Sequence, residues 1–149
     1  IMALKDQLMA DMKEAMKAHD KDRLAVIRMV RGAIRQQEID GKKELGDSDV
    51  IAVISKEVKM RKDSIEEFKK GDRQDLVEKT QAEIEVLMPY MPTQLSEAEV
   101  SELVKAAVEE TGAKTQKDMG KVMGKLMPKV KGRADGKMVN NIVRSMLQG

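Results

Sequence analysis

The sequence predicts an all-helical protein, with four helices before a proline-containing boundary and three after it. Apolar residues recur at helical spacing almost without a break along the chain. Aromatic residues make up only 1% of the chain and methionines number 13, so flexible aliphatic side chains must fill the interior. With 149 residues, the chain can bury one core or two small helical subdomains.

The first two predicted helices lie on either side of a short polar segment. Apolar residues at helical spacing mark the first helix over residues 4–16 and the second over residues 26–34. The polar sequence HDKD at 19–22 is expected to end or bend the first helix. Gly41 and Gly46 are expected to break the second.

Polar residues predict where the next two helices begin. Asp47 or Ser48 can cap a third helix, whose apolar periodicity runs to Gly71. Asp72 can cap a fourth helix, which should stop at Pro89.

The segment MPYMPTQLSEAE is the best candidate for a domain boundary. Its prolines, Pro89 and Pro92, each push the preceding residue out of the α region and remove a backbone donor. We therefore expect an N-terminal subdomain over 2–89, a linker over 90–95 and a C-terminal subdomain over 96–149.

Capping signals divide the C-terminal part into three helices. Each signal places a side-chain acceptor at the first free N–H groups of a helix. The signals are Ser96 with Glu99, Thr115 with Asp118, and Asp135. Gly112 is expected to end the first of these helices.

The stretch DMGKVMGKLMPKVKGRADGK, residues 118–137, repeats methionine, glycine and lysine every four residues. On a helical wheel the apolar residues share one face, the lysines another, and Gly120 and Gly124 border both. Each exposed helical glycine costs about 1 kcal/mol relative to alanine, so something should use the room it leaves. A neighbouring helix is one explanation for the glycines, and a phosphate backbone is another.

Charge is concentrated at the C-terminal end of the chain. Residues 113–149 hold nine basic side chains against two acidic ones, a local net charge of +7, whereas the whole chain carries +2. Such polarity is typical of a surface that meets nucleic acid, although a solvated charged face is the common alternative. The candidate RNA-contacting residues are Lys117, Gly120, Lys121, Gly124, Lys125, Lys129, Lys131, Arg133 and Lys137.

Several functional classes find no support in the sequence. There is no cysteine for a nucleophile, a thiolate metal site or a disulfide, and no apolar run long enough to span a membrane. GKVMGK and GRADGK are one residue too short for a phosphate loop, and neither His19 nor any acidic pair suggests catalysis. We expect no catalytic residues, no metal and no cofactor. We also expect a cytoplasmic location, and a natural start at Met2 after an extraneous Ile1.

Four arginines in the N-terminal part call for partners. Arg28, Arg31 and Arg35 share one face of the second helix. Over residues 1–92 acidic side chains outnumber basic ones nineteen to eighteen, so we expect these arginines to pair with neighbouring helices. Arg61 projects from the apolar side of the third helix and should snorkel or find a buried carboxylate.

Four motifs together resemble the YqeY-like proteins. They are KMRKDSIEEFKKGDRQDL (59–76), YMPTQLSEAE (90–99), DMGKVMGKLM (118–127) and GRADGKMVNNIV (132–143). These small bacterial proteins are similar to the tail of one subunit of the glutamyl/aspartyl-tRNA amidotransferase. Met91 stands where the family usually has leucine before proline.

The resemblance implies an up-and-down four-helix bundle followed by a three-helix tail of the kind that helps hold tRNA. The family carries the label of a carbon–nitrogen ligase with glutamine as amido-N-donor. This chain has no Ser/Lys amidase signature, cysteine nucleophile or phosphoryl-transfer site, so we expect a tRNA-binding accessory protein without catalysis of its own. The alternative is a protein-interaction adapter that docks a partner helix on the methionine face, which would have to be exposed.

Overall fold

The structure is a computed structural model that describes residues 2–147, and its elements are seven α-helices and two short 3-10 turns. The all-helical prediction is therefore confirmed for these residues. In the N-terminal part the elements are α1 (Leu4–Lys17), α2 (Lys21–Gly41), α3 (Asp47–Lys70), α4 (Gln74–Leu87) and the turn η1 (Met88–Tyr90). In the C-terminal part they are α5 (Glu97–Thr111), the turn η2 (Gln116–Asp118), α6 (Met119–Val130) and α7 (Gly136–Met146). Ile1 lies outside the described residues.

The chain divides into two compact units between Met91 and Pro92, within the segment expected to be a linker. Each unit has its own hydrophobic core. No helix among the described residues is both long enough and apolar enough to cross a membrane.

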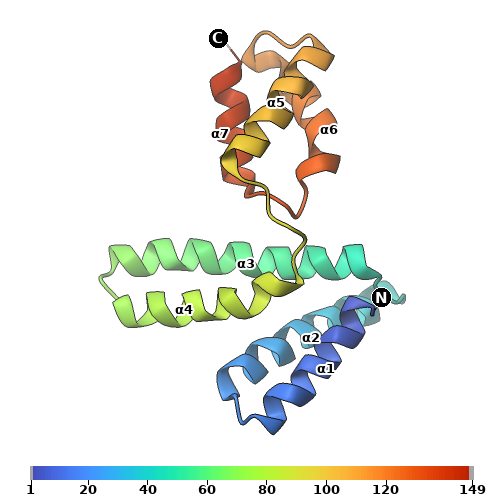
Figure 1. Ribbon diagram of the computed structural model, residues 1–149, viewed down its shortest axis with the longest axis vertical. Coiled ribbons are helices and arrows are strands. Elements are labelled where there is room, and N and C mark those ends of the chain that lie inside the picture. The colour runs from blue at the N-terminus through green and yellow to red at the C-terminus, as the bar shows by residue number, and fades with distance from the viewer. Residues whose placement is uncertain (1, 148–149) are drawn as a thin grey trace. The chain divides into compact units, whose positions relative to one another are not determined.

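The N-terminal unit consists of two helical hairpins. Helices α1 and α2 pack against each other, as do α3 and α4, and α2 packs against both α3 and α4. Figure 1 shows the α1–α2 hairpin inclined to the α3–α4 hairpin, so an up-and-down bundle with four aligned axes is not confirmed. The buried side chains that hold the hairpins together include Leu8, Ile27, Val30, Val50, Ile54 and Leu87.

The turns between the first three helices follow the sequence prediction. Helix α1 ends at Lys17, His19 takes a left-handed conformation (φ 56°), and the carboxylate of Asp20 accepts from the N–H of Arg23 to start α2. Helix α2 ends at Gly41, as expected from the glycines. These features are local, so the sequence around each turn is sufficient to specify them.

Two predicted helix caps are wrong. Gly46, not Asp47 or Ser48, is the N-cap residue of α3, and the Asp47 carboxylate instead accepts from the N–H of Leu4 at 3.0 Å, at the start of α1. Asp72 lies in the turn before α4 with a left-handed backbone (φ 54°), an arrangement that short polar side chains tolerate. Arg73 is the N-cap residue of α4, so the helix begins one residue later than a cap at Asp72 requires.

The C-terminal unit begins with the predicted capping box. The hydroxyl of Ser96 accepts from the N–H of Glu99 at 3.1 Å, and the Glu99 carboxylate accepts from the N–H of Ser96 at 3.0 Å. Gly112 ends α5 with φ 67°, and Asp135 caps α7 by accepting from the N–H of Lys137 at 3.0 Å. All three predictions are confirmed.

The segment before α5 is attached to the loop between α6 and α7. The N–H of Leu95 donates to the carbonyl of Arg133 at 2.8 Å, and the Gln94 amide donates to the carbonyl of Gly132 at 3.0 Å. Residues 94–95 are thus part of the C-terminal unit.

Arg61 has found carboxylates, as expected. Its Nη1 lies 2.9 Å from Oε1 of Glu57, and its Nε lies 3.1 Å from Oε1 of Glu83. The side chain of Arg61 is only 15% exposed, so both pairs are largely shielded from water. The pair with Glu57 lies within α3, and the pair with Glu83 joins α3 to α4.

Candidate nucleic-acid interface

The candidate interface begins where η2 leads into α6. The carboxylate of Asp118 accepts from the N–H groups of Lys114 and Thr115, at 2.9 and 3.2 Å. These two hydrogen bonds, and to a smaller extent the charge of Lys121, lower the pKa of Asp118. Lys117 lies on the turn η2, whereas Lys121, Lys125 and Lys129 lie on α6.

The apolar face of α6 forms part of the core. Val122, Leu126 and Val130 are buried, and Met119 and Met123 pack partly buried against the same cluster. Among the methionines of α6, only Met127 is largely exposed, at 41%. Most of the face that a protein-interaction adapter would present is therefore already covered within the unit.

The two glycines of α6 face open space. Both are exposed, and a Cβ atom built on Gly120 or Gly124 meets no atom of the described chain within 4 Å, the glycine's own neighbours and local helix backbone apart. The sequence left a neighbouring helix as one explanation for these glycines, and no helix of the C-terminal unit fills that role. No packing contact within this unit requires a glycine at either position.

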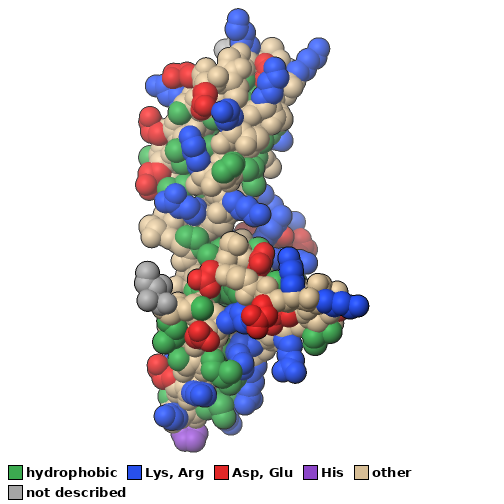
Figure 2. All heavy atoms as spheres, turned by 90° about the vertical axis from the view of Figure 1, so that its right-hand side faces the viewer, with side chains coloured by type: hydrophobic (Ala, Val, Ile, Leu, Met, Phe, Trp, Pro, Cys, Tyr) green, Lys and Arg blue, Asp and Glu red, His purple; other side chains and the backbone are tan. Residues whose placement is uncertain are grey.

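Lysines lie beside this open strip on the surface of α6. Lys121, Lys125 and Lys129 are exposed, as is Lys117 on the preceding turn. Figure 2 shows the C-terminal unit, at the top, from the side on which α6 lies in Figure 1. Lys and Arg side chains project across this view, and most of the visible acidic side chains gather toward one edge.

Helix α5 supplies the acid that contacts this surface. Nζ of Lys125 lies 3.0 Å from Oε1 of Glu110, and this contact, with a smaller contribution from Lys129, lowers the pKa of Glu110. Both side chains of the pair are about half exposed, so the pair is weak and available for exchange with another anion.

The remaining candidates surround the loop between α6 and α7. Lys131 is exposed at the end of α6, and Lys137 is exposed in the first turn of α7. Arg133 is half-buried, and its Nε donates to the carbonyl of Thr93 at 3.3 Å. One donor of Arg133 therefore holds the loop in place, which the sequence did not reveal.

Charge is separated within the C-terminal unit. Residues 92–112 carry five acidic side chains and one basic one, whereas residues 113–149 carry the nine basic side chains and two acidic ones. The unit thus holds ten basic side chains against seven acidic ones, a net charge of +3. A polarised unit of this kind presents a cationic surface even though its net charge is modest.

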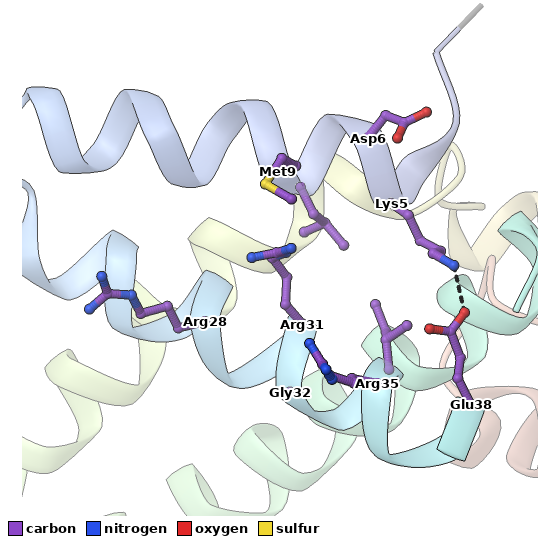
Figure 3. Close-up of a pocket in the computed structure, with 10 residues that line it drawn as sticks. Lys5, Asp6, Met9, Arg28, Arg31, Gly32, Arg35 and Glu38 are labelled. Carbon is purple, nitrogen blue, oxygen red and sulfur yellow. Dashed lines mark hydrogen bonds and ion pairs between the residues drawn. The ribbon is translucent and has the colours of Figure 1, made fainter. Parts of the chain in front are cut away.

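The expected pairing of the α2 arginines with neighbouring helices is wrong. Among the described residues, Arg28, Arg31 and Arg35 make no ion pair within 4.0 Å, and the polar contact of Arg31 is 3.1 Å to the sulfur of Met12. They line a groove between α1 and α2 of about 420 Å³ (Figure 3). The sequence signal that could have indicated this groove is Gly32, a mid-helix glycine among three arginines, just as the glycines of α6 lie among lysines.

The described residues offer no metal site, because no group of three or more His, Asp or Glu side chains is arranged to hold an ion. The candidate interface consists of cationic side chains and exposed helix backbone, groups that attract anions in general.

Comparison with known proteins gives one family model and several similar fungal proteins. The family model described as Yqey-like protein matches residues 5–147. The protein named altered inheritance of mitochondria protein 41, mitochondrial, from Pyrenophora tritici-repentis is 41% identical over 106 residues, covering 69% of this chain and 58% of that protein. Its namesake from Kluyveromyces lactis is 45% identical over 84 residues, covering 56% of this chain and 45% of that protein.

These relatives are fungal proteins with mitochondrial names, so they do not support the bacterial origin and cytoplasmic location expected from the sequence. The chain spans about half the length of these curated relatives, and nothing in their names states what they bind. The family model, by contrast, covers nearly the whole chain. On that match, together with the all-helical structure, the chain belongs to the YqeY-like family.

Proposed function

We propose that the C-terminal unit binds the sugar-phosphate backbone of a structured RNA, with tRNA as the first candidate. The observation that carries this proposal is the open space over Gly120 and Gly124 beside exposed lysines. An exposed helical glycine costs about 1 kcal/mol relative to alanine, and nothing inside the C-terminal unit uses the room. A ligand from outside, drawn by the lysines, can use it.

The chemistry of the strip suits phosphate. Without a Cβ at either glycine, a phosphodiester chain can approach the helix more closely than it could over alanine, and this brings its charges nearer to Lys121 and Lys125. Lys125 can exchange its exposed partner Glu110 for a phosphate, because an exposed pair contributes little. The resemblance of DMGKVMGKLM and GRADGKMVNNIV to the amidotransferase tail supports RNA as the anion.

Reading of individual bases is not expected at this surface. Recognition of RNA bases depends on aromatic side chains on which unpaired bases stack. Phe68 and Tyr90, the chain's Phe and Tyr, both belong to the N-terminal unit, and Tyr90 is buried with its hydroxyl bonded to Asp11. We therefore propose recognition by shape and charge, in an accessory role without catalysis by this chain.

The salt dependence of tRNA binding tests this proposal. Each phosphate that a lysine neutralises contributes a slope of roughly −0.7 to −0.9 to a plot of log affinity against log salt. Replacing Lys117, Lys121 and Lys125 by alanine should therefore weaken binding and make the slope shallower by about 2 to 3. Circular dichroism should show unchanged helix content, because alanine is the better helix former.

A matched control removes the same charge from a different helix. Lys59, Lys62 and Lys69 are exposed on α3, and their replacement by alanine changes the net charge equally. This variant should keep the wild-type slope, since long-range charge is screened at physiological salt. Equal tRNA affinity and slope for wild type and the α6 variant would defeat the proposal.

A further inference from the structure

The groove between α1 and α2 is cationic at its edges and apolar at its base. Figure 3 shows the side chain of Arg31 extending from α2 toward α1, while those of Arg28 and Arg35 run more nearly along α2. Leu8 and Ile34 are buried beneath them. The groove has a volume of about 420 Å³, within the range of ligand-binding sites in proteins.

The acids at the groove leave the arginines uncompensated. Lys5 Nζ lies 2.5 Å from Oε2 of Glu38, and the same oxygen accepts from the N–H of Leu45 at 2.8 Å. This engagement, with a smaller effect of Arg35, lowers the pKa of Glu38 and keeps it ionised. Asp6 is exposed at the first turn of α1, so the groove carries four basic and two acidic side chains.

Arg31 shows most clearly that the site is incomplete. Its guanidinium is part-buried, yet its polar contact is with the sulfur of Met12, a weak acceptor. A guanidinium in such a place gains from a carboxylate or phosphate that completes its hydrogen bonds. Gly32, between Arg31 and Arg35, is exposed, and a Cβ atom built on it meets no atom within 4 Å, so it leaves room for that ligand.

We propose that this groove docks an acidic amphipathic helix of a partner protein. Arg28, Arg31 and Arg35 are spaced three and four residues apart, so they climb α2 by about 10 Å over two turns. Glutamates at i, i+3 or i+4, and i+7 of a partner helix repeat with the same rise. The apolar side of that helix would cover Met9, which is 37% exposed, and the base formed by Leu8 and Ile34.

Charge and polarity favour a helix over a nucleic acid here. The N-terminal part carries nineteen acidic and eighteen basic side chains over residues 1–92, so its overall field does not attract a polyanion. A phosphate backbone would also bring charged oxygens over an apolar base that offers them no donors. A short acidic helix needs only a local match of charge to the arginines, and its apolar side would remove Met9 from water.

The test uses two synthetic helical peptides of about 18 residues with the full chain. One has leucines along one face and glutamates at helical spacing beside them, and the other replaces each glutamate with glutamine. Fluorescence anisotropy at low salt should show the glutamate peptide binding about tenfold tighter, as expected for three exposed ion pairs. Replacing Arg28, Arg31 and Arg35 by glutamine should abolish that difference.

Two controls separate groove binding from general charge and from unfolding. Lys62→Gln, Lys69→Gln and Lys79→Gln together remove the same charge from exposed positions of α3 and α4 and should leave peptide affinity unchanged. In the wild-type protein, methyl resonances of Met9 and Met12 should shift on peptide addition, and that of the exposed Met60 on α3 should not.

The outcomes are decisive in both directions. No binding of the glutamate peptide, equal binding of the two peptides, or retained binding by the arginine variant overturns the proposal. A duplex RNA that shifts Met9 and Met12 when the peptide does not would assign the groove to phosphate and overturn it as well. The proposed tRNA site is tested separately, because the arginine variant should keep wild-type tRNA affinity and salt slope.

Discussion

Replacing both α6 glycines by alanine should stabilise the protein and weaken RNA binding at once. No atom lies within 4 Å of a Cβ built at Gly120 or Gly124, so each new methyl group meets no obstacle. Alanine is favoured over glycine by about 1 kcal/mol per exposed helical position, which gives about 2 kcal/mol for the pair. For a unit of this size the melting temperature should rise by roughly 8 to 16 °C.

The loss of RNA affinity follows from a small change in distance. If the methyl groups move a phosphate from about 4 to about 6 Å from a lysine, the attraction in water falls by about 0.3 kcal/mol. Three such contacts lose about 1 kcal/mol together, or roughly fivefold in affinity. Differential scanning calorimetry and filter binding with tRNA measure the two effects on the same preparation.

Gly32→Ala provides the matched control. Gly32 is also an exposed helical glycine with nothing within 4 Å of its built Cβ, but it lies on α2 of the N-terminal unit. It should give a similar stabilisation per residue with unchanged tRNA affinity. A destabilised Gly120→Ala, Gly124→Ala variant would refute the open-space argument, and a stabilised variant with wild-type tRNA affinity would refute close approach of the backbone.

Three further predictions concern caps and charge. Ser96→Ala should lower the free energy of unfolding of the C-terminal unit by about 1 kcal/mol in urea titrations, because the Glu99 N–H loses its acceptor. Asp47→Ala should cost a similar amount and increase hydrogen exchange at the start of α1, where Leu4 loses its cap. The lowered pKa of Glu38 means that its pairing with Lys5 stabilises the fold above the carboxyl's ordinary pKa and is lost as pH falls through the lowered value. In the Glu38→Gln variant, the free energy of unfolding should therefore depend less on pH below about pH 5 than in the wild-type protein. The same pH profile in both proteins would contradict this account.

What the sequence could predict was local. The capping box of Ser96 with Glu99, the helix end at Gly112 and the cap at Asp135 each involve residues within a few positions of one another. A local pattern competes with few alternatives, so its structure can be derived without knowledge of the fold.

Caps that depend on the fold could not be derived in this way. Asp47 stands before an apolar helix, as a cap should, but its carboxylate binds the N–H of Leu4, 43 residues earlier. The N–H of Gly46, the N-cap residue of α3, donates to the Asp49 carboxylate at 3.3 Å, so α3 needs no cap from Asp47. The packing of α1 beside α3 decided which helix that carboxylate serves.

The partners of charged side chains were predictable only where burial forces an answer. Arg61 projects from an apolar side, where an unpaired charge would be costly, so it had to reach water or find a carboxylate, and it pairs with two. Arg28 and Arg35 are exposed, and nothing forces an exposed arginine to pair, whereas the half-buried Arg31 contacts only the sulfur of Met12 among the polar contacts described. The expected pairing of Arg28 and Arg35 failed because water can solvate an exposed guanidinium.

The glycines show most directly what only coordinates could decide. Sequence periodicity placed Gly120 and Gly124 between an apolar face and a basic face, a position compatible with contact on either side. The structure leaves both positions open within the C-terminal unit, so no packing contact of that unit requires a small residue there. Gly32 stands in the same situation among arginines, on a helix whose apolar side is also buried. If room for an external anion is the common reason, an alanine at each position should be tolerated by the fold and harmful only to binding, which separates these glycines from those that a packed core requires.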